Sequence, residues 1–176
     1  KNSMSAELKD STRVMTLLGT HGKLPEWKAR RQSAGHLAIP ILSTNSVEGA
    51  PMIAALMREL GVSFESLVAT TPASAIMVKT AFSECGGVFH VPDASSGRDS
   101  LGRLIVPAQT FVAQHGVQSV FGVGGRFIGA DIVVALVVFA REPVDKMTAL
   151  QFLPFPQYFA IHTLQAVNER RFFFVS

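Results

Sequence analysis

The chain has 176 residues, of which 48% are hydrophobic and 16% charged, and this balance excludes an intrinsically disordered chain. The 16 basic and 13 acidic residues leave a formal net charge of +3, too small an excess to predict nucleic-acid binding. Cys85 stands alone, which excludes an internal disulfide and a cysteine-based metal cluster.

The distribution of apolar residues bears on where the protein is located. The longest apolar run, residues 132–140, is much shorter than the roughly 18 residues of a membrane-spanning helix. Residues 1–10 are polar and lack the apolar core of a signal peptide. We therefore expect a cytoplasmic protein with no membrane partner. Residues 1–176 are expected to form one domain, and the start at Lys1 indicates a piece of a longer protein.

The N-terminal part of the chain predicts two helices followed by an extended segment. Residues 4–18 carry apolar residues at helical spacing and no internal Gly or Pro, which predicts a helix. Pro25 suits the first position of a second, brief helix. Residues 36–42 are apolar and β-branched, and Pro40 places them at a sheet edge or in an extended entry segment.

The next helix is the clearest in the sequence. Apolar residues recur at helical spacing over residues 46–60, where Ser46 can cap the first turn and Gly61 can end the last. Because Pro51 belongs in a first helical turn, the helix is also predicted to begin as late as residue 49 or 50.

The middle of the chain is less clearly marked. Residues 62–68 predict a strand, and residues 74–82 predict either a helix or a strand. A strand over 87–91 is closed by Pro92, and a polar loop rich in Ser and Gly follows over 93–104.

A helix and two strands follow the loop. Pro107 opens the helix and Gly116 ends it. The strands are expected over residues 117–123 and 131–140, joined by a turn at the glycines of residues 122–125. A dinucleotide-binding loop is disfavoured because the third glycine position holds Phe127 and a strand follows.

The C-terminal part predicts a long helix from Pro143 that Pro154 and Pro156 kink or split, with a second helical run from Gln157 to about Asn168. The tight turn between the two most apolar strands favours an antiparallel sheet over a doubly wound parallel one. The expected fold class is α+β, with a central antiparallel sheet flanked by N- and C-terminal helices.

Part of this pattern resembles a known family. Gly116, Ser119, the strand over 132–139, "REPVD" and the helix after it follow the order of the C-terminal half of GAF domains. The segments "LPEWKARRQSAGH", "FHVPDA" and "IVPAQTFV" are similar to the variant found ahead of bacterial histidine kinases. The resemblance covers about residues 24–165. It implies a GAF/PAS-like sensory domain of a two-component system, a homodimer with a covalently linked output domain and no catalytic residues of its own.

The histidines and hydroxyls leave two chemical alternatives open. His90 lies in an apolar strand and His162 on an apolar helical face, so each is either a haem ligand or a core histidine. No histidine has the spacing of another metal site. The alternative is a small hydrolase or reductase that uses Cys85, or a serine of the loop, together with His90. The loop serines are Ser95, Ser96 and Ser100.

The leading hypothesis is a small-molecule sensor with an apolar pocket lined by the sheet and residues 89–115. Strand alternation places Phe89 on the face opposite His90. The effector, apolar or haem-like, remains open. A structural dimerisation module with a filled core is a third hypothesis. The expected ligand-binding residues are Phe89, His90, Arg103, Gln109, Phe111, Phe121 and Val134.

Overall fold

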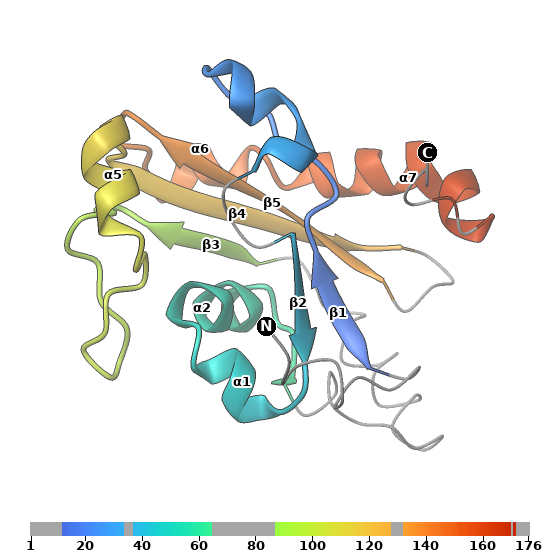
Figure 1. The fold of residues 1–176 in the computed structure, drawn as a ribbon, viewed down its shortest axis with the longest axis horizontal. Coiled ribbons are helices and arrows are strands. Elements are labelled where there is room, and N and C mark those ends of the chain that lie inside the picture. The colour runs from blue at the N-terminus through green and yellow to red at the C-terminus, as the bar shows by residue number, and fades with distance from the viewer. Residues whose placement is uncertain (1–11, 34–36, 65–86, 128–131, 170, 172–176) are drawn as a thin grey trace.

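The structure is a computed structural model in which two antiparallel sheets are surrounded by short and long helices (Figure 1). The predicted α+β class and the antiparallel strand pairing are confirmed. The residues that the structure describes are 12–33, 37–64, 87–127, 132–169 and 171.

The N-terminal sheet pairs β1 (Arg13–Thr16) with β2 (Ala38–Ile41) in antiparallel register. The helix predicted over residues 4–18 is therefore wrong for residues 13–16, and residues 1–11 lie outside the described part. Val14 and Thr16 are β-branched, and pairing with a distant strand overrides the local helical spacing. The extended segment predicted around Pro40 is confirmed as β2.

Helix α1 (Thr44–Glu48) begins with a reciprocal cap. The Ser43 hydroxyl accepts from the Ser46 backbone N–H at 3.2 Å, and the Ser46 hydroxyl accepts from the Ser43 N–H at 3.1 Å. The predicted capping role of Ser46 is confirmed in part: Ser46 belongs to the reciprocal cap, but as the third helical residue, and Ser43 is the N-cap residue.

Helix α2 (Pro51–Glu59) follows immediately, with its proline at the start. The predicted single helix over 46–60 is thus two helices, and the later start predicted at residue 49 or 50 agrees with the N-cap of α2 at Ala50. Gly61 adopts φ 72° and ends α2 as predicted. Leu56 and Leu60 turn the apolar side of α2 to the core, where they are 6% and 1% exposed.

The main sheet has the strand order β3-β4-β5 and is antiparallel throughout. Its strands are β3 (Val88–Val91), β4 (Ser119–Arg126) and β5 (Val133–Ala140). The predicted strand before Pro92 is confirmed as β3, and the predicted pairing of the last two strands is confirmed. No strand forms over residues 62–64, and the rest of the segment predicted as 62–68 and 74–82 lies outside the described residues.

The glycines of residues 122–125 lie inside β4, so the turn predicted at them is wrong. Side chains would collide here with both neighbouring helices. A Cβ at Gly124 would lie 2.6 Å from Leu60 Cδ1, and one at Gly125 would lie 2.9 Å from Pro156 Cβ. Glycine in the strand therefore allows α2 and the C-terminal helix to approach β4 from opposite sides.

The C-terminal part contains two helices, α6 (Lys146–Leu150) and α7 (Pro154–Asn168). The long helix predicted from Pro143 is divided between them. Pro154 begins α7, because a proline lacking an N–H is tolerated in a first helical turn. The predicted end near Asn168 is confirmed.

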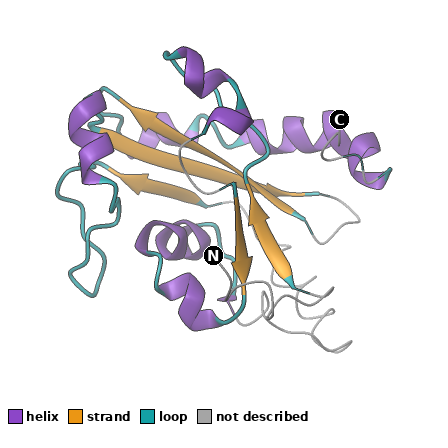
Figure 2. Ribbon diagram, in the orientation of Figure 1, coloured by secondary structure: helices purple, strands orange, loops and turns teal. Residues whose placement is uncertain are grey.

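The main sheet lies between two helical layers (Figure 2). Alternation along the strands gives each face its own core. Phe89, Val91 and Val120 pack with α2 on one face, which we call the α2 face. Phe121 and Val123 pack with α6 on the opposite face, the α7 face.

Helix α5 (Gln109–His115) begins two residues later than predicted and ends at Gly116, which adopts φ 63°. The brief helix predicted from Pro25 is present as two 3-10 turns, η1 (Pro25–Lys28) and η2 (Arg30–Gln32). Among the described residues, no helix combines the length and apolarity needed to cross a membrane.

Candidate functional site

The predicted ligand-binding residues lie on two sides of the main sheet. Phe89 is 1% exposed in the core of the α2 face, and Phe111 packs against the same core. His90 lies beside Phe121 on the α7 face, and Val134 packs there against Phe127 and α7. The structure therefore brings Phe89 and Phe111 together and separates them from the other three by the thickness of the sheet.

Gln109 is used within the α2 side of the molecule. Its side-chain amide donates to the carbonyl of Ala94 at 3.0 Å and to that of Val106 at 2.7 Å. Ala94 lies at the start of the polar loop, and Val106 lies two residues beyond its end. Gln109 thus holds the loop closed instead of standing free at a pocket rim.

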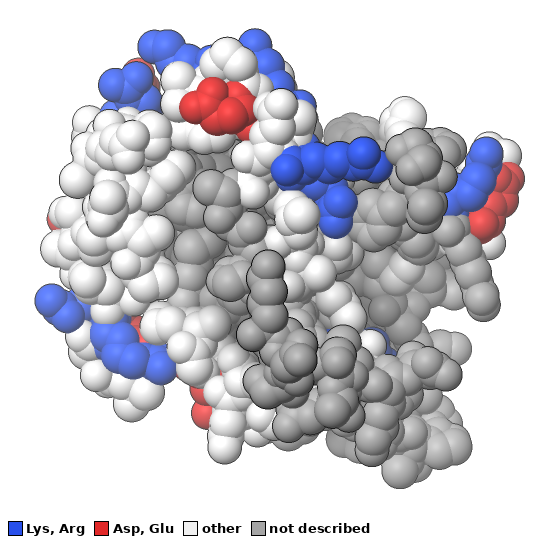
Figure 3. All heavy atoms as spheres, viewed as in Figure 1, with Lys and Arg blue, Asp and Glu red and all other residues white. Residues whose placement is uncertain are grey.

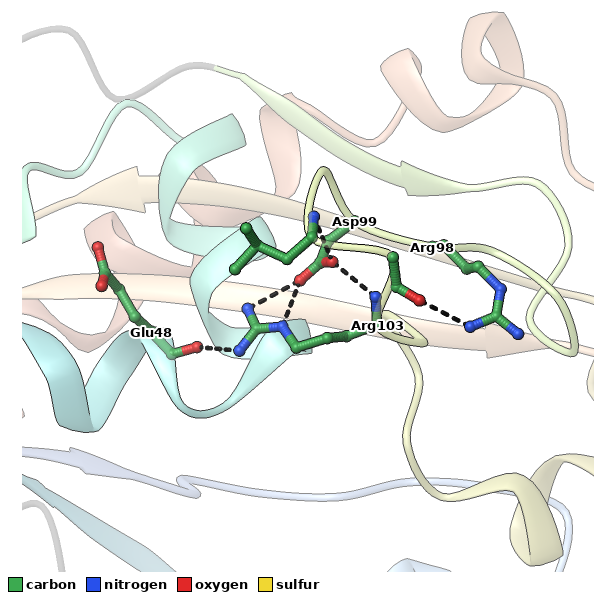
Figure 4. A network of polar contacts seen from close by, with 6 residues as sticks. Glu48, Arg98, Asp99 and Arg103 are labelled. Carbon is green, nitrogen blue, oxygen red and sulfur yellow. Dashed lines mark hydrogen bonds and ion pairs between the residues drawn. The ribbon is translucent and has the colours of Figure 1, made fainter.

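Arg103 ties the same loop to helix α1 (Figure 4). Its Nε donates to Asp99 Oδ2 at 2.8 Å, and its Nη1 donates to the Glu48 carbonyl at 2.8 Å. The Asp99 side chain is only 7% exposed. Burial alone would raise the pKa of Asp99, but hydrogen bonds from the backbone and side chain of Arg103 lower it below its usual value. Arg103 therefore fixes the polar loop against α1 on the α2 side of the sheet.

The serines at the start of the loop engage Asp93. Ser95 Oγ donates to Asp93 Oδ1 at 2.6 Å, and Ser96 Oγ donates to Asp93 Oδ2 at 2.6 Å. These bonds, that of Ser95 foremost, lower the pKa of Asp93 from 3.8 to about 2. Both serines bond to a carboxylate two or three residues earlier in the chain, which is the hydrogen-bonding pattern of a turn.

Replacing Asp93 with Asn is expected to reduce the fall in melting temperature between pH 6 and pH 2. The carboxylate has a lower pKa folded than unfolded, so its contribution is complete above about pH 4 and is lost as pH falls toward 2. Melting temperatures measured by circular dichroism from pH 6 to 2 should show wild type above Asp93→Asn at pH 6. The two should converge near pH 2. A constant gap between them down to pH 2 would contradict the role of the ionised carboxylate.

A cluster of part-buried hydrogen bonds around the buried Ser119 lies on the α7 face, where the chain leaves the sheet. Ser119 is 0% exposed, and its Oγ donates to the Glu142 carbonyl at 2.8 Å and accepts from the Val144 N–H at 3.1 Å. His90 Nε2 lies 2.6 Å from the Val144 carbonyl oxygen. A carbonyl oxygen only accepts, so Nε2 carries the donated proton. Side chains of β3 and β4 thus hold both backbone groups of Val144.

We call Ser119, His90 and Val144 the junction. The next residue, Asp145, caps α6 by accepting from the Thr148 N–H at 2.6 Å. That hydrogen bond is the main cause of the lowered pKa of Asp145. The junction therefore fixes the point from which α6 and α7 start. In the sequence, Ser119 is marked only as part of the GAF-like order of residues; the other signal is a lone polar residue at the start of an apolar strand.

The two haem-ligand candidates differ in burial: His90 is part-buried, and His162 is exposed. His90 Nε2 is engaged by Val144 as above, so axial ligation through this atom would have to break that bond. His162 is exposed on α7, and its Nδ1 lies 2.7 Å from the Tyr158 carbonyl one turn earlier. Within the described ranges, no three His, Cys, Asp or Glu side chains cluster as metal ligands would. Cys85 lies outside them.

No protein-family model, curated protein or solved structure matches the chain. The described residues form a small α+β fold in which hydrogen bonds of Ser119 and His90 join the main sheet to the segment that leads into the C-terminal helices. The resemblance to GAF domains over residues 24–165, and with it the single-domain boundary, stays a prediction.

Proposed function

We propose that the chain is a non-catalytic regulatory module of the GAF type. It binds a small effector on the α2 side of the sheet and relays binding through α6 and α7 to a covalently linked output domain. The observation that carries the proposal is the junction, where His90 and Ser119, from two strands, both hold Val144. Any displacement of β3 relative to β4 moves the start of the C-terminal helices.

The two faces of the strands supply the route. Phe89 faces the α2 core, while the next residue, His90, faces Val144. An effector that contacts Phe89 or Phe111 therefore acts on the same strand that holds the junction. The effector shifts the orientation of α7 only as far as it binds one arrangement better than the other.

Absorption spectroscopy and native mass spectrometry of the purified protein test the proposal. We expect a discrete added mass that is lost on denaturation. A Soret band would identify the effector as haem, and His90→Ala and His162→Ala would then show which histidine ligates it. A colourless protein at its bare mass, together with no stabilisation by any compound of a metabolite library, would contradict effector binding.

A second candidate function, a structural dimerisation module, is favoured by the outer side of α7. Phe155, Tyr158 and Ile161 are 54%, 61% and 64% exposed. No charged residue stands between Lys146 and Glu169. An exposed apolar, uncharged helix side is typical of an interface. This side lets two copies meet without repulsion between like charges, and it is equally suited to an output domain.

Ile161→Glu is expected to weaken dimerisation about 100-fold, because an unpaired charge would be buried between two copies. Ile161 is 64% exposed, so the monomer fold tolerates the change. Sedimentation velocity over a concentration series measures the effect. Leu101→Glu, at a 74% exposed apolar residue of the polar loop, is the matched control. A monomeric wild type, or a dimer that survives Ile161→Glu, would rule out this surface as the interface.

A further inference from the structure

Residues 18–33, which we call the strap, leave the β1–β2 sheet and extend toward α5. The base of the strap is joined by hydrogen bonds. The Leu17 N–H donates to the Leu37 carbonyl at 2.9 Å, Thr16 Oγ1 donates to the same oxygen at 3.2 Å, and Arg30 Nε donates to the Leu17 carbonyl. By contrast, the two 3-10 turns within the strap, η1 and η2, bury no residue.

One aromatic side chain connects the far end of the strap to the body of the domain. The ring centroid of Trp27 lies 4.7 Å from that of His115, edge-on, and 5.7 Å from that of Phe111. Phe111 continues the contact to Phe139 of β5, at 5.7 Å between centroids. Trp27 itself is only half-buried.

The strap folds back over the indole at Gly22. A Cβ at this position would lie 2.6 Å from Trp27 Cε3, so only glycine permits the close approach. Three basic side chains of the strap are exposed: Lys23, Lys28 and Arg31. Figure 3 shows Lys and Arg atoms gathered along the top of this face, where Figure 1 places residues 20–33. The strap thus has a polar outer side and an aromatic inner contact.

We propose that Trp27 is a latch that holds the strap closed. Releasing the indole from His115 and Phe111 lets the strap swing away while the base at Leu17 and Leu37 stays paired. The open state uncovers Phe111 and Phe139, the latter already 40% exposed in the closed state. A segment that buries little and is held at its far end by ring contacts opens without unfolding of the core. The latch does not depend on the proposed effector.

The strap can move without the residues that it covers, because those residues are held by other parts of the domain. Phe111 packs against the core of the α2 face, and Phe139 belongs to β5. Both keep these positions when the strap opens, because neither η1 nor η2 has a buried residue that would be part of that core. Opening therefore exposes a preformed aromatic surface at the end of β5, the strand next to β4 of the junction.

Trp27 is the one tryptophan of the chain, so its fluorescence reports on the latch directly. In the intact chain, His115→Ala is expected to increase acrylamide quenching of Trp27. It should also speed tryptic cleavage after Lys23, Lys28 or Arg31 about tenfold, as the loss of an aromatic contact allows. Trp27→Ala should speed the same cleavage at least as much. The melting temperature monitored by far-ultraviolet circular dichroism should change little in both variants.

Leu101→Ala is the matched control, because Leu101 is 74% exposed on the polar loop and lies outside the ring cluster of Trp27, Phe111 and His115. It should leave quenching and cleavage at wild-type values. The latch would be refuted if His115→Ala left both unchanged. It would also be refuted if the strap were cleaved only at the rate of global unfolding, measured in parallel, without protease, by far-ultraviolet circular dichroism after transfer into urea.

Discussion

Ser119→Ala lowers the free energy of unfolding by about 1–3 kcal/mol, because it leaves two part-buried backbone groups that face the Ser119 hydroxyl without their partner. The Glu142 carbonyl loses its donor, and the Val144 N–H loses its acceptor, at a site where Ser119 is 0% exposed. The removed hydroxyl is small, so the cavity contributes little. Urea denaturation followed by circular dichroism measures the difference.

The control for this variant is Ser100→Ala, which removes a hydroxyl from an exposed position of the polar loop. It should stay within about 0.5 kcal/mol of wild type. A Ser119→Ala protein as stable as Ser100→Ala would mean that the junction contributes nothing to stability.

Gly87→Ala has the largest expected effect among the glycines that the structure describes. A Cβ at Gly87 would lie 1.6 Å from the Glu59 carbonyl oxygen and 2.8 Å from the Glu59 carbonyl carbon. These are backbone atoms at the end of α2, so no side-chain rotation relieves the clash. Helix α2 would have to move away from β3 and give up contacts of the α2 core, at a cost of about 3 kcal/mol.

The same denaturation experiment, with Gly19→Ala as control, measures this cost. A Cβ at Gly19 would meet no atom within 4 Å, so this variant should unfold like wild type. If Gly87→Ala showed no greater loss than Gly19→Ala, the close packing of α2 on the start of β3 would be incorrect.

Local signals in the sequence were sufficient for several elements. The strand before Pro92, the end of α5 at Gly116 and the end of α2 at Gly61 follow from the conformational limits of proline and glycine alone. The antiparallel pairing of β4 with β5 follows from two apolar, β-branched segments close together in the chain.

Elements that depend on distant contacts were predicted incorrectly. Residues 13–16 have helical spacing, yet they pair with residues 38–41. The glycines of β4 predict a turn, because the sequence does not reveal that Leu60 and Pro156 pack against them from two sides.

The candidate site shows the same division. Strand alternation correctly separates Phe89 from His90, but it does not say which helix covers which face. The junction joins Ser119 to a backbone group of Val144, and no side-chain pattern marks a backbone partner in the sequence. Only the buried position of a lone serine at the start of a strand was available as a signal.

Hydrogen exchange measured by mass spectrometry on wild type and Ser119→Ala tests most directly whether the junction links the sheet to α7. We predict that α7 peptides from residues 154–168 lose protection in the variant, while peptides covering α2 and β3 keep theirs. Loss of protection spread evenly over all these peptides, or unchanged protection in α7, would contradict a relay through Val144.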